Sequence, residues 1–233
     1  MANKKKIEAR LEAERQARQT RIIQIAGIAV VLIVVVAGAW WLTPTSSEVD
    51  AGITDGACAP FADIHVAAQY TAPEIRIDTA GQYFANVKMA KGGEFLIQLY
   101  PDKAPITVNN FVFLACKGFY DGSTFHRVID GFMAQGGDPT GTGTSGPGYQ
   151  FVNEKNDLAF DQAGVVAMAN AGLNTNGSQF FIMFNAYGLT EDSYTIFGQV
   201  VEGMEVVNGI RRRDPQSDPL PGDAMESVTI SEK

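Results

Sequence analysis

The sequence predicts a mainly β domain that follows a single transmembrane helix. Short runs rich in β-branched and aromatic residues recur between Tyr83 and Lys233, separated by clusters of Gly, Asn, Asp and Pro. One uncharged apolar stretch lies near the amino terminus. Many short strands are typical of either a β-barrel or a β-sandwich, and the runs alone do not distinguish these two architectures.

The first 21 residues form a basic head. They contain seven Lys or Arg and three Glu, whereas the rest of the chain contains eleven Lys or Arg and twenty-three Asp or Glu. Basic residues beside an apolar segment favour the cytoplasmic side of a membrane. We therefore expect residues 1–21 to be cytoplasmic. The acidic remainder repels polyanions and argues against nucleic acid as a partner.

The stretch from Ile22 to Leu42 predicts the transmembrane helix. It has no charge and one polar side chain, Gln24, and a helix of this length spans about 30 Å. Trp40 and Trp41 at its end are typical of a membrane interface. A cleaved signal peptide is the alternative, but its apolar region is normally shorter. We expect a retained anchor, and thus a single-pass membrane protein with an extracytoplasmic carboxyl-terminal domain.

Residues 43–80 lack sustained periodicity and are rich in Ala, Thr, Asp, Gly and Pro, which predicts a tether that packs at most partly onto the domain. Cys58 lies in this tether, and Cys116 lies in an apolar stretch. Two cysteines without CxxC spacing favour neither a disulfide scaffold nor a zinc site. We expect Cys116 to be a small buried thiol and Cys58 to be free, with a disulfide as the less favoured alternative.

The domain itself is expected over residues 81–233. Two segments have helical spacing: residues 104–118, with Val108, Phe111, Val112 and Ala115 on one side, and residues 202–212. Seven runs predict strands, at residues 83–89, 94–100, 124–129, 165–169, 179–184, 194–201 and 227–231.

Conventional catalytic groups are scarce. The two histidines, His65 and His126, are too few for a metal cluster or a His-based triad, so we expect no metal and no cofactor. The glycine-rich stretch at 141–148 has no following Lys-Ser/Thr, which favours a flexible surface loop over a phosphate loop.

Arg127 stands out because it precedes two strings of apolar and amide residues, GFMAQGGD and MANAGLNTNGSQFF. Alternation in a strand places His126 and Arg127 on opposite faces. From the residues alone, Arg127 either forms a surface ion pair or faces a pocket. By the same reasoning Phe132, Met133 and Phe181 would belong to the core.

At these residues the sequence closely resembles the cyclophilins. FHRVIDGFMAQGGDPTGTG at 125–143, MANAGLNTNGSQFFI at 168–182 and IFGQVVEGMEVV at 196–207 look like three signature segments of that family. The resemblance extends from about Tyr83 to the carboxyl terminus. It implies a closed eight-stranded β-barrel capped by two α-helices, a substrate groove on the outer surface of the barrel, and peptidyl-prolyl cis-trans isomerase activity.

The resemblance also implies roles for individual residues. Arg127 matches the catalytic arginine, which would stabilise the twisted amide. Phe132, Met133 and Phe181 would line the pocket for the proline ring, and Gln135 would hydrogen-bond the peptide backbone. The full set of implied substrate-binding positions is His126, Phe132, Met133, Gln135, Ala169, Asn170, Gln179, Phe181, Leu189 and Tyr194.

Two of these positions depart from the family pattern. Leu189 falls where many cyclophilins carry a groove Trp, and Tyr194 falls where they carry a groove His. The expected domain contains no Trp, since both tryptophans lie in the membrane segment. The resemblance therefore implies retained isomerase activity but weakened binding of cyclosporin-like ligands.

The partners that we expect are Pro-containing polypeptides among exported or surface proteins. The alternative is a chaperone or scaffold that holds Pro-containing segments in the same groove with little turnover. A domain that only localises a partner is a third interpretation, but no recruiting motif is visible in the head or the tether.

Overall fold

The computed structural model describes Cys58, residues 68–190 and residues 192–233. The predicted head and transmembrane helix, residues 1–42, lie outside these residues, so both stay predictions. Within the described part of the chain, no helix is long and apolar enough to cross a membrane.

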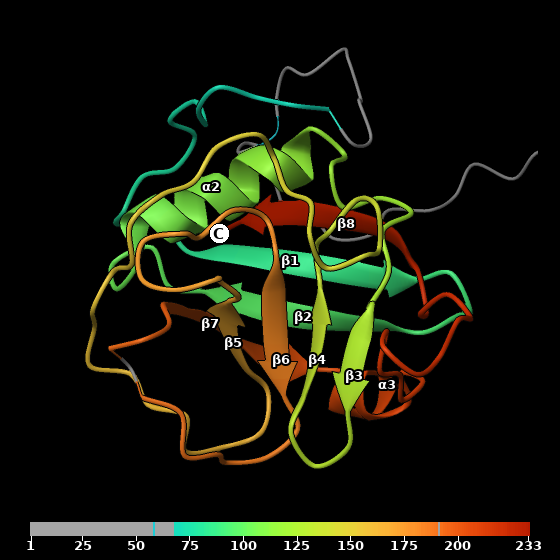
Figure 1. Ribbon diagram of the computed structural model, residues 1–233. Helices are drawn as coiled ribbons and strands as arrows, with labels where there is room; N and C mark the ends of the chain where they lie inside the picture. The colour runs from blue at the N-terminus through green and yellow to red at the C-terminus, as the bar shows by residue number, and fades with distance from the viewer. Residues whose placement is uncertain (1–57, 59–67, 191) are drawn as a thin grey trace, which may run out of the picture. The chain divides into compact units, whose positions relative to one another are not determined.

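Eight strands form one curled antiparallel sheet with the spatial order β3-β4-β6-β5-β7-β2-β1-β8 (Figure 1). Each of the seven predicted runs overlaps a strand. The eighth strand, β4, was missed because its sequence, MAQG, contains no β-branched or aromatic residue. The strands are β1 (Tyr83–Met89), β2 (Glu94–Leu99), β3 (Arg127–Ile129), β4 (Met133–Gly136), β5 (Val165–Met168), β6 (Phe180–Met183), β7 (Ile196–Glu202) and β8 (Met225–Glu232).

The expectation of a fully closed barrel is met only in part. The eight strands are present, but β3 and β8 form the two ends of the ladder. Residues next to these strands link the ends: Gly122 N–H donates to the Met225 carbonyl at 2.8 Å, and Phe125 N–H donates to the Asp223 carbonyl at 2.9 Å. Because β3 has only three residues, it is too short to pair along β8.

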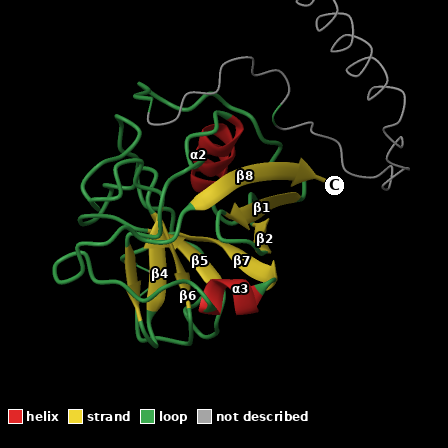
Figure 2. Ribbon diagram, turned by 90° about the vertical axis from the view of Figure 1, so that its right-hand side faces the viewer, coloured by secondary structure: helices red, strands yellow, loops and turns green. Residues whose placement is uncertain are grey.

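Two helices cap opposite ends of the curled sheet, α2 (Pro105–Cys116) and α3 (Met204–Asn208), as both views show (Figures 1 and 2). Pro105 at the first turn of α2 suits a helix start, because its missing N–H would have no partner there. The predicted apolar face of α2 is buried. Helix α3 is shorter than its pattern suggested because Gly203, in the left-handed conformation, and Gly209 bound it.

Alternation along the strands separates two apolar clusters. The inner face of β3, β4, β6 and β5 joins the main core through Val128, Ala134, Ile182 and Val166. The outer face of the same strands carries a second cluster that includes Met133, Ala167, Phe181 and Met183. An apolar cluster on the outer face is thus built into the strand register.

The expectation of free thiols is wrong, because Cys58 and Cys116 form a disulfide. Cys116 is the last residue of α2. The local sequence around each cysteine carries no signal for a contact between residues 58 positions apart. Part of the predicted tether also packs onto the domain, since the Tyr70 ring meets the Phe113 ring of α2 edge-on at 5.1 Å between centroids.

Candidate active site

A transverse row of side chains crosses the outer face of the sheet. Arg127 lies opposite Gln135, and Gln135 lies opposite Phe181. The row continues through Ala167 to Ile196. Directly opposed residues of an antiparallel sheet share a face. The register therefore brings together the predicted catalytic Arg127 and two of the predicted substrate-binding residues.

The apolar part of the site surrounds Phe181. Met133 and Phe181 are buried, and four further predicted residues pack against them with partial exposure. The Tyr194 ring meets the Phe181 ring edge-on at 5.4 Å between centroids. The four partly exposed residues are Phe132, Ala169, Leu189 and Tyr194. Each predicted apolar position thus belongs to one cluster.

Two aromatic residues were not predicted, one inside this cluster and one in contact with its edge. Phe160 stacks on Phe181 at 5.9 Å with an interplanar angle of 16°. Tyr187 lies 4.3 Å from the Phe132 ring and is half exposed. Both residues lie outside the strands and helices, where no periodicity marks them as part of a site.

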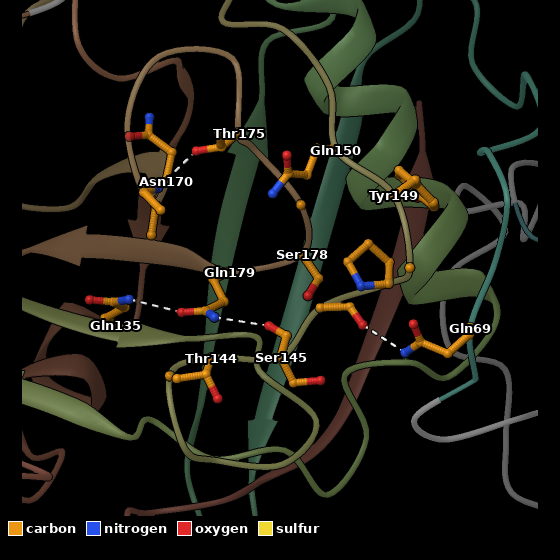
Figure 3. Close-up of a pocket in the computed structure, with 17 residues that line it drawn as sticks. Gln69, Gln135, Thr144, Ser145, Tyr149, Gln150, Asn170, Thr175, Ser178 and Gln179 are labelled. Carbon is orange, nitrogen blue, oxygen red and sulfur yellow. Dashed lines mark hydrogen bonds between the residues drawn. The ribbon is translucent and has the colours of Figure 1, made fainter.

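An amide network borders the apolar cluster. Gln135 Nε2 donates to Gln179 Oε1 at 3.0 Å, and Gln179 Nε2 donates to the Ser145 carbonyl at 2.9 Å (Figure 3). Both glutamines line a polar pocket of about 860 Å³, together with Ala169, Asn170 and the segment 143–150. The network fixes the orientation of the Gln135 amide at the boundary between apolar and polar surfaces.

The glycine-rich segment 141–148 is a surface loop, as expected, but its contribution to a pocket wall was missed. The buried Asp138 carboxylate accepts hydrogen bonds from the N–H groups of Gly143, at 2.6 Å, and Ser145, at 3.2 Å. Burial raises the pKa of Asp138, but these bonds and those from Thr140 outweigh burial and hold the pKa below its usual value. An ionised Asp138 thus organises the loop.

Strand β3 is short but held on both edges. Strand β4 pairs with one edge, and on the other edge Val128 N–H donates to the Arg213 carbonyl at 2.7 Å while Arg213 N–H donates to the Val128 carbonyl at 2.9 Å. The backbone that carries Arg127 is therefore fixed. Among the described residues, the half-buried Arg127 side chain forms no ion pair, so the ion-pair interpretation is not supported there.

His126 was expected in the groove, but only 1% of its surface is exposed. Alternation turns its ring to the face opposite Arg127, beneath Gly143 of the loop. Neither ring nitrogen has a hydrogen-bond partner within the described residues. Burial is the largest cause and lowers the pKa of His126; the Asp138 carboxylate and the Thr124 backbone oppose this effect, and the cations of Arg213 and Arg127 lower the pKa further. His126 is therefore a neutral buried residue below the site.

Asn170 is fixed at the edge of the polar pocket. Its Nδ2 donates to the Ser193 carbonyl at 2.9 Å, and its Oδ1 accepts from Gly172 N–H at 3.1 Å. These bonds use the side chain. Within the described part of the chain, no backbone hydrogen bond uses the N–H or carbonyl of Asn170 itself.

Fold and site together define a peptidyl-prolyl cis-trans isomerase. A family model described as cyclophilin type peptidyl-prolyl cis-trans isomerase/CLD matches residues 84–230, and the chain belongs to this family. The activity implied by the sequence resemblance is thereby supported.

Several similar proteins are named as peptidyl-prolyl cis-trans isomerases. Peptidyl-prolyl cis-trans isomerase A of Mycobacterium tuberculosis is 46% identical over 159 residues, which cover 60% of this chain and 87% of the relative. Peptidyl-prolyl cis-trans isomerase B of Streptomyces anulatus is 43% identical over 172 residues, covering 65% and 98%. A crystal structure of a Cryptosporidium parvum cyclophilin type isomerase, in the presence of the dipeptide Ala-Pro, matches with a TM-score of 0.59 and 33% identity, covering 63% of this chain and 98% of that one.

Proposed function

We propose that this isomerase accelerates the rotation of X-Pro bonds in exported or surface proteins without a covalent intermediate, and that Arg127 stabilises the twisted amide. The observation that carries the proposal is the row of Arg127, Gln135 and Phe181 on one face of three adjacent strands. Two strand spacings, about 10 Å, separate the backbone positions of Arg127 and Phe181, a span that the long arginine side chain can partly bridge toward a proline ring held against Phe181.

Catalysis requires only that the site bind the twisted transition state more tightly than the planar ground state. The barrier to amide rotation is about 18–20 kcal/mol and arises from resonance. In the twisted transition state the prolyl nitrogen regains its lone pair, so a guanidinium aimed at it favours the transition state over the planar ground state. Arg127, on a strand fixed at both edges, supplies this donor.

The residues that surround Arg127 position the substrate. The cluster around Phe181 and Met133 holds the proline ring and excludes water, which strengthens the contact with Arg127. Gln135 contacts the peptide backbone, and the unused backbone groups of Asn170 pin the residue before proline. The Ala-Pro dipeptide in the Cryptosporidium parvum structure supports a proline-containing substrate.

The cellular setting is also proposed. The basic head and the apolar segment at 22–42 favour a single-pass membrane protein with its amino terminus in the cytoplasm and its catalytic domain outside. The disulfide between Cys58 and Cys116 supports this setting, because disulfides persist mainly in oxidising compartments.

The experiment is a cis-to-trans assay on a Pro-containing peptide with the full chain in detergent, its Arg127→Ala variant, and a matched control, Lys88→Ala, which removes a cation from an exposed ion pair on β1. We expect acceleration by the full chain and by the control, and a loss of about 10²–10³-fold in kcat/KM for Arg127→Ala.

Two outcomes would contradict the proposal in different ways. Full activity of Arg127→Ala would remove the arginine mechanism while leaving the isomerase. A folded full chain that accelerates no peptide, yet binds Pro-containing segments, would favour the alternative of a chaperone or scaffold that uses the same groove.

A further inference from the structure

Residues that precede the sheet take part in the polar pocket. Gln69 lines it, and every other lining residue comes from residues 135–179. Gln69 Nε2 donates to the Gly146 carbonyl at 2.9 Å (Figure 3), and Tyr70 N–H donates to the Pro147 carbonyl at 2.7 Å. The chain before β1 thus forms one wall of the pocket.

This wall is fastened along helix α2. Arg76 N–H donates to Asn109 Oδ1 at 2.7 Å, the Tyr70 ring packs against Phe113, and Cys58 is bonded to Cys116. The three helix positions are spaced by four and three residues, so they lie on one face of α2. Several contacts therefore hold the segment in place.

The loop opposite is shaped to accept it. Gly148 has a φ of +97°, and a Cβ added there would lie 2.8 Å from the Tyr70 carbonyl oxygen and 2.9 Å from Gln69 Oε1. A larger residue would thus be strained and would also collide with the segment. The close approach of Gln69 to the pocket loop depends on this glycine.

The pocket chemistry indicates what Gln69 meets. The lining residues carry amides, hydroxyls and backbone groups, and none of them carries a formal charge. The pocket adjoins the apolar cluster through Ala169. Asn170, which we expect to hold the residue before proline, also lines it. A substrate side chain that enters here meets an uncharged polar surface.

We propose that Gln69 is a specificity-determining residue: the segment before β1 supplies a wall of the polar pocket, and this wall selects uncharged side chains among the substrate residues that precede proline. The inference rests on the proposed function, because it concerns the same groove. It assigns a role in substrate selection to a part of the chain that precedes the family match, which begins at residue 84.

The test changes the charge of this wall in both directions. Full-length Gln69→Glu and Gln69→Lys are assayed on peptides that carry Lys, Glu or Gln at the residues before proline. The matched controls are Gln82→Glu and Gln82→Lys, which place the same charges at an exposed position outside the pocket. Thermal midpoints of the four variants report whether the fold is kept.

We expect the wild-type chain to prefer the Gln peptide. Gln69→Glu raises the ratio of kcat/KM for the Lys peptide to that for the Glu peptide about three- to tenfold, and Gln69→Lys lowers it by a similar factor. The Lys variant also retains a side-chain donor that can reach toward the Gly146 carbonyl, whereas the Glu variant has none.

Failures of the two proposals are distinguishable. If the wild-type chain is active but the Gln69 variants shift the ratio no more than the Gln82 variants, Gln69 does not read the substrate and this inference is overturned, while the proposed function stands. If the wild-type chain accelerates none of the peptides, both proposals fall.

Discussion

Arg127 of β3 and Gln135 of β4 lie directly opposite each other in the antiparallel register, so both side chains leave the sheet on its outer face. A slip of one residue would send them to the core. The paired bonds between Val128 and Arg213 on the other edge of β3 oppose such a slip.

Arg127→Lys tests whether charge alone suffices. The ammonium keeps the charge but lacks the planar fork of the guanidinium. We expect kcat/KM to fall by about ten- to a hundredfold, an effect smaller than that of Arg127→Ala. Peptide isomerisation measured beside thermal unfolding checks this, and wild-type activity in Arg127→Lys would show that geometry is unimportant.

Tyr187→Ala tests the rim of the apolar cluster. Its ring lies 4.3 Å from that of Phe132, so its removal exposes one face of a residue that we expect to contact proline. We expect KM to rise about three- to tenfold with little change in kcat, because an aromatic contact of about 0.5–1.5 kcal/mol is lost. Leu220→Ala, at another exposed apolar position, is the control. Equal KM values for the two variants would contradict the assignment.

His126 makes stability depend on pH. Its pKa is lowered in the folded protein, chiefly by burial, whereas the unfolded chain has a pKa near the ordinary value of about 6.5. Between these two values the unfolded chain binds more protons, so stability is fully present above about pH 6.5 and declines as the pH falls toward the folded pKa.

The check on His126 compares thermal midpoints at pH 7.5 and pH 5.5 for the wild-type chain and for His126→Gln. The variant cannot titrate at this position, so its midpoint falls less on acidification. An equal fall in both proteins would place the pH dependence on other groups.

Cys58→Ser/Cys116→Ser tests the disulfide. The bond closes a loop between residues separated by 58 positions, and its loss is expected to lower the free energy of unfolding by about 2–4 kcal/mol. Denaturant unfolding of the oxidised wild-type chain, the same chain after reduction, and the double variant checks this. Two titratable thiols in the folded wild-type chain would show that the bond does not form.

Leu189→Trp tests the departure from the cyclophilin groove. Leu189 packs at the edge of the apolar cluster, at the position where many cyclophilins carry Trp. We expect weak inhibition of the wild-type chain by cyclosporin and about tenfold stronger inhibition of the variant, since an indole adds apolar contact area. Unchanged inhibition would place the determinant elsewhere.

The sequence allowed much of the fold to be predicted where a pattern was local. Alternating or β-rich runs marked seven strands, and helical spacing marked the buried face of α2. It failed for β4, whose sequence MAQG contains no β-branched or aromatic residue. The pairing of Cys58 with Cys116 was mispredicted because it depends on a long-range contact that neither cysteine's neighbours reveal.

The residues of the site were likewise predictable only where a local motif marked them. The signature segments located Arg127, Gln135 and Phe181, and strand pairing then joined them into a row. Phe160 and Gln69 reach the site from segments without periodicity, so only the folded chain identifies them. The motif position placed His126 in the groove, whereas alternation in the strand had already placed its ring on the face opposite Arg127, and there the ring is buried.

The fit between Gly148 and residues 69–70 has a practical consequence for anyone who shortens this protein. A fragment that begins at residue 84, where the family match begins, would lose only Tyr83 from the eight strands and would keep the row of Arg127, Gln135 and Phe181. It would also lose Gln69 and Tyr70, and thus one wall of the polar pocket. If the proposed role of Gln69 holds, we expect turnover measured on such a fragment to be less selective than that of the full chain.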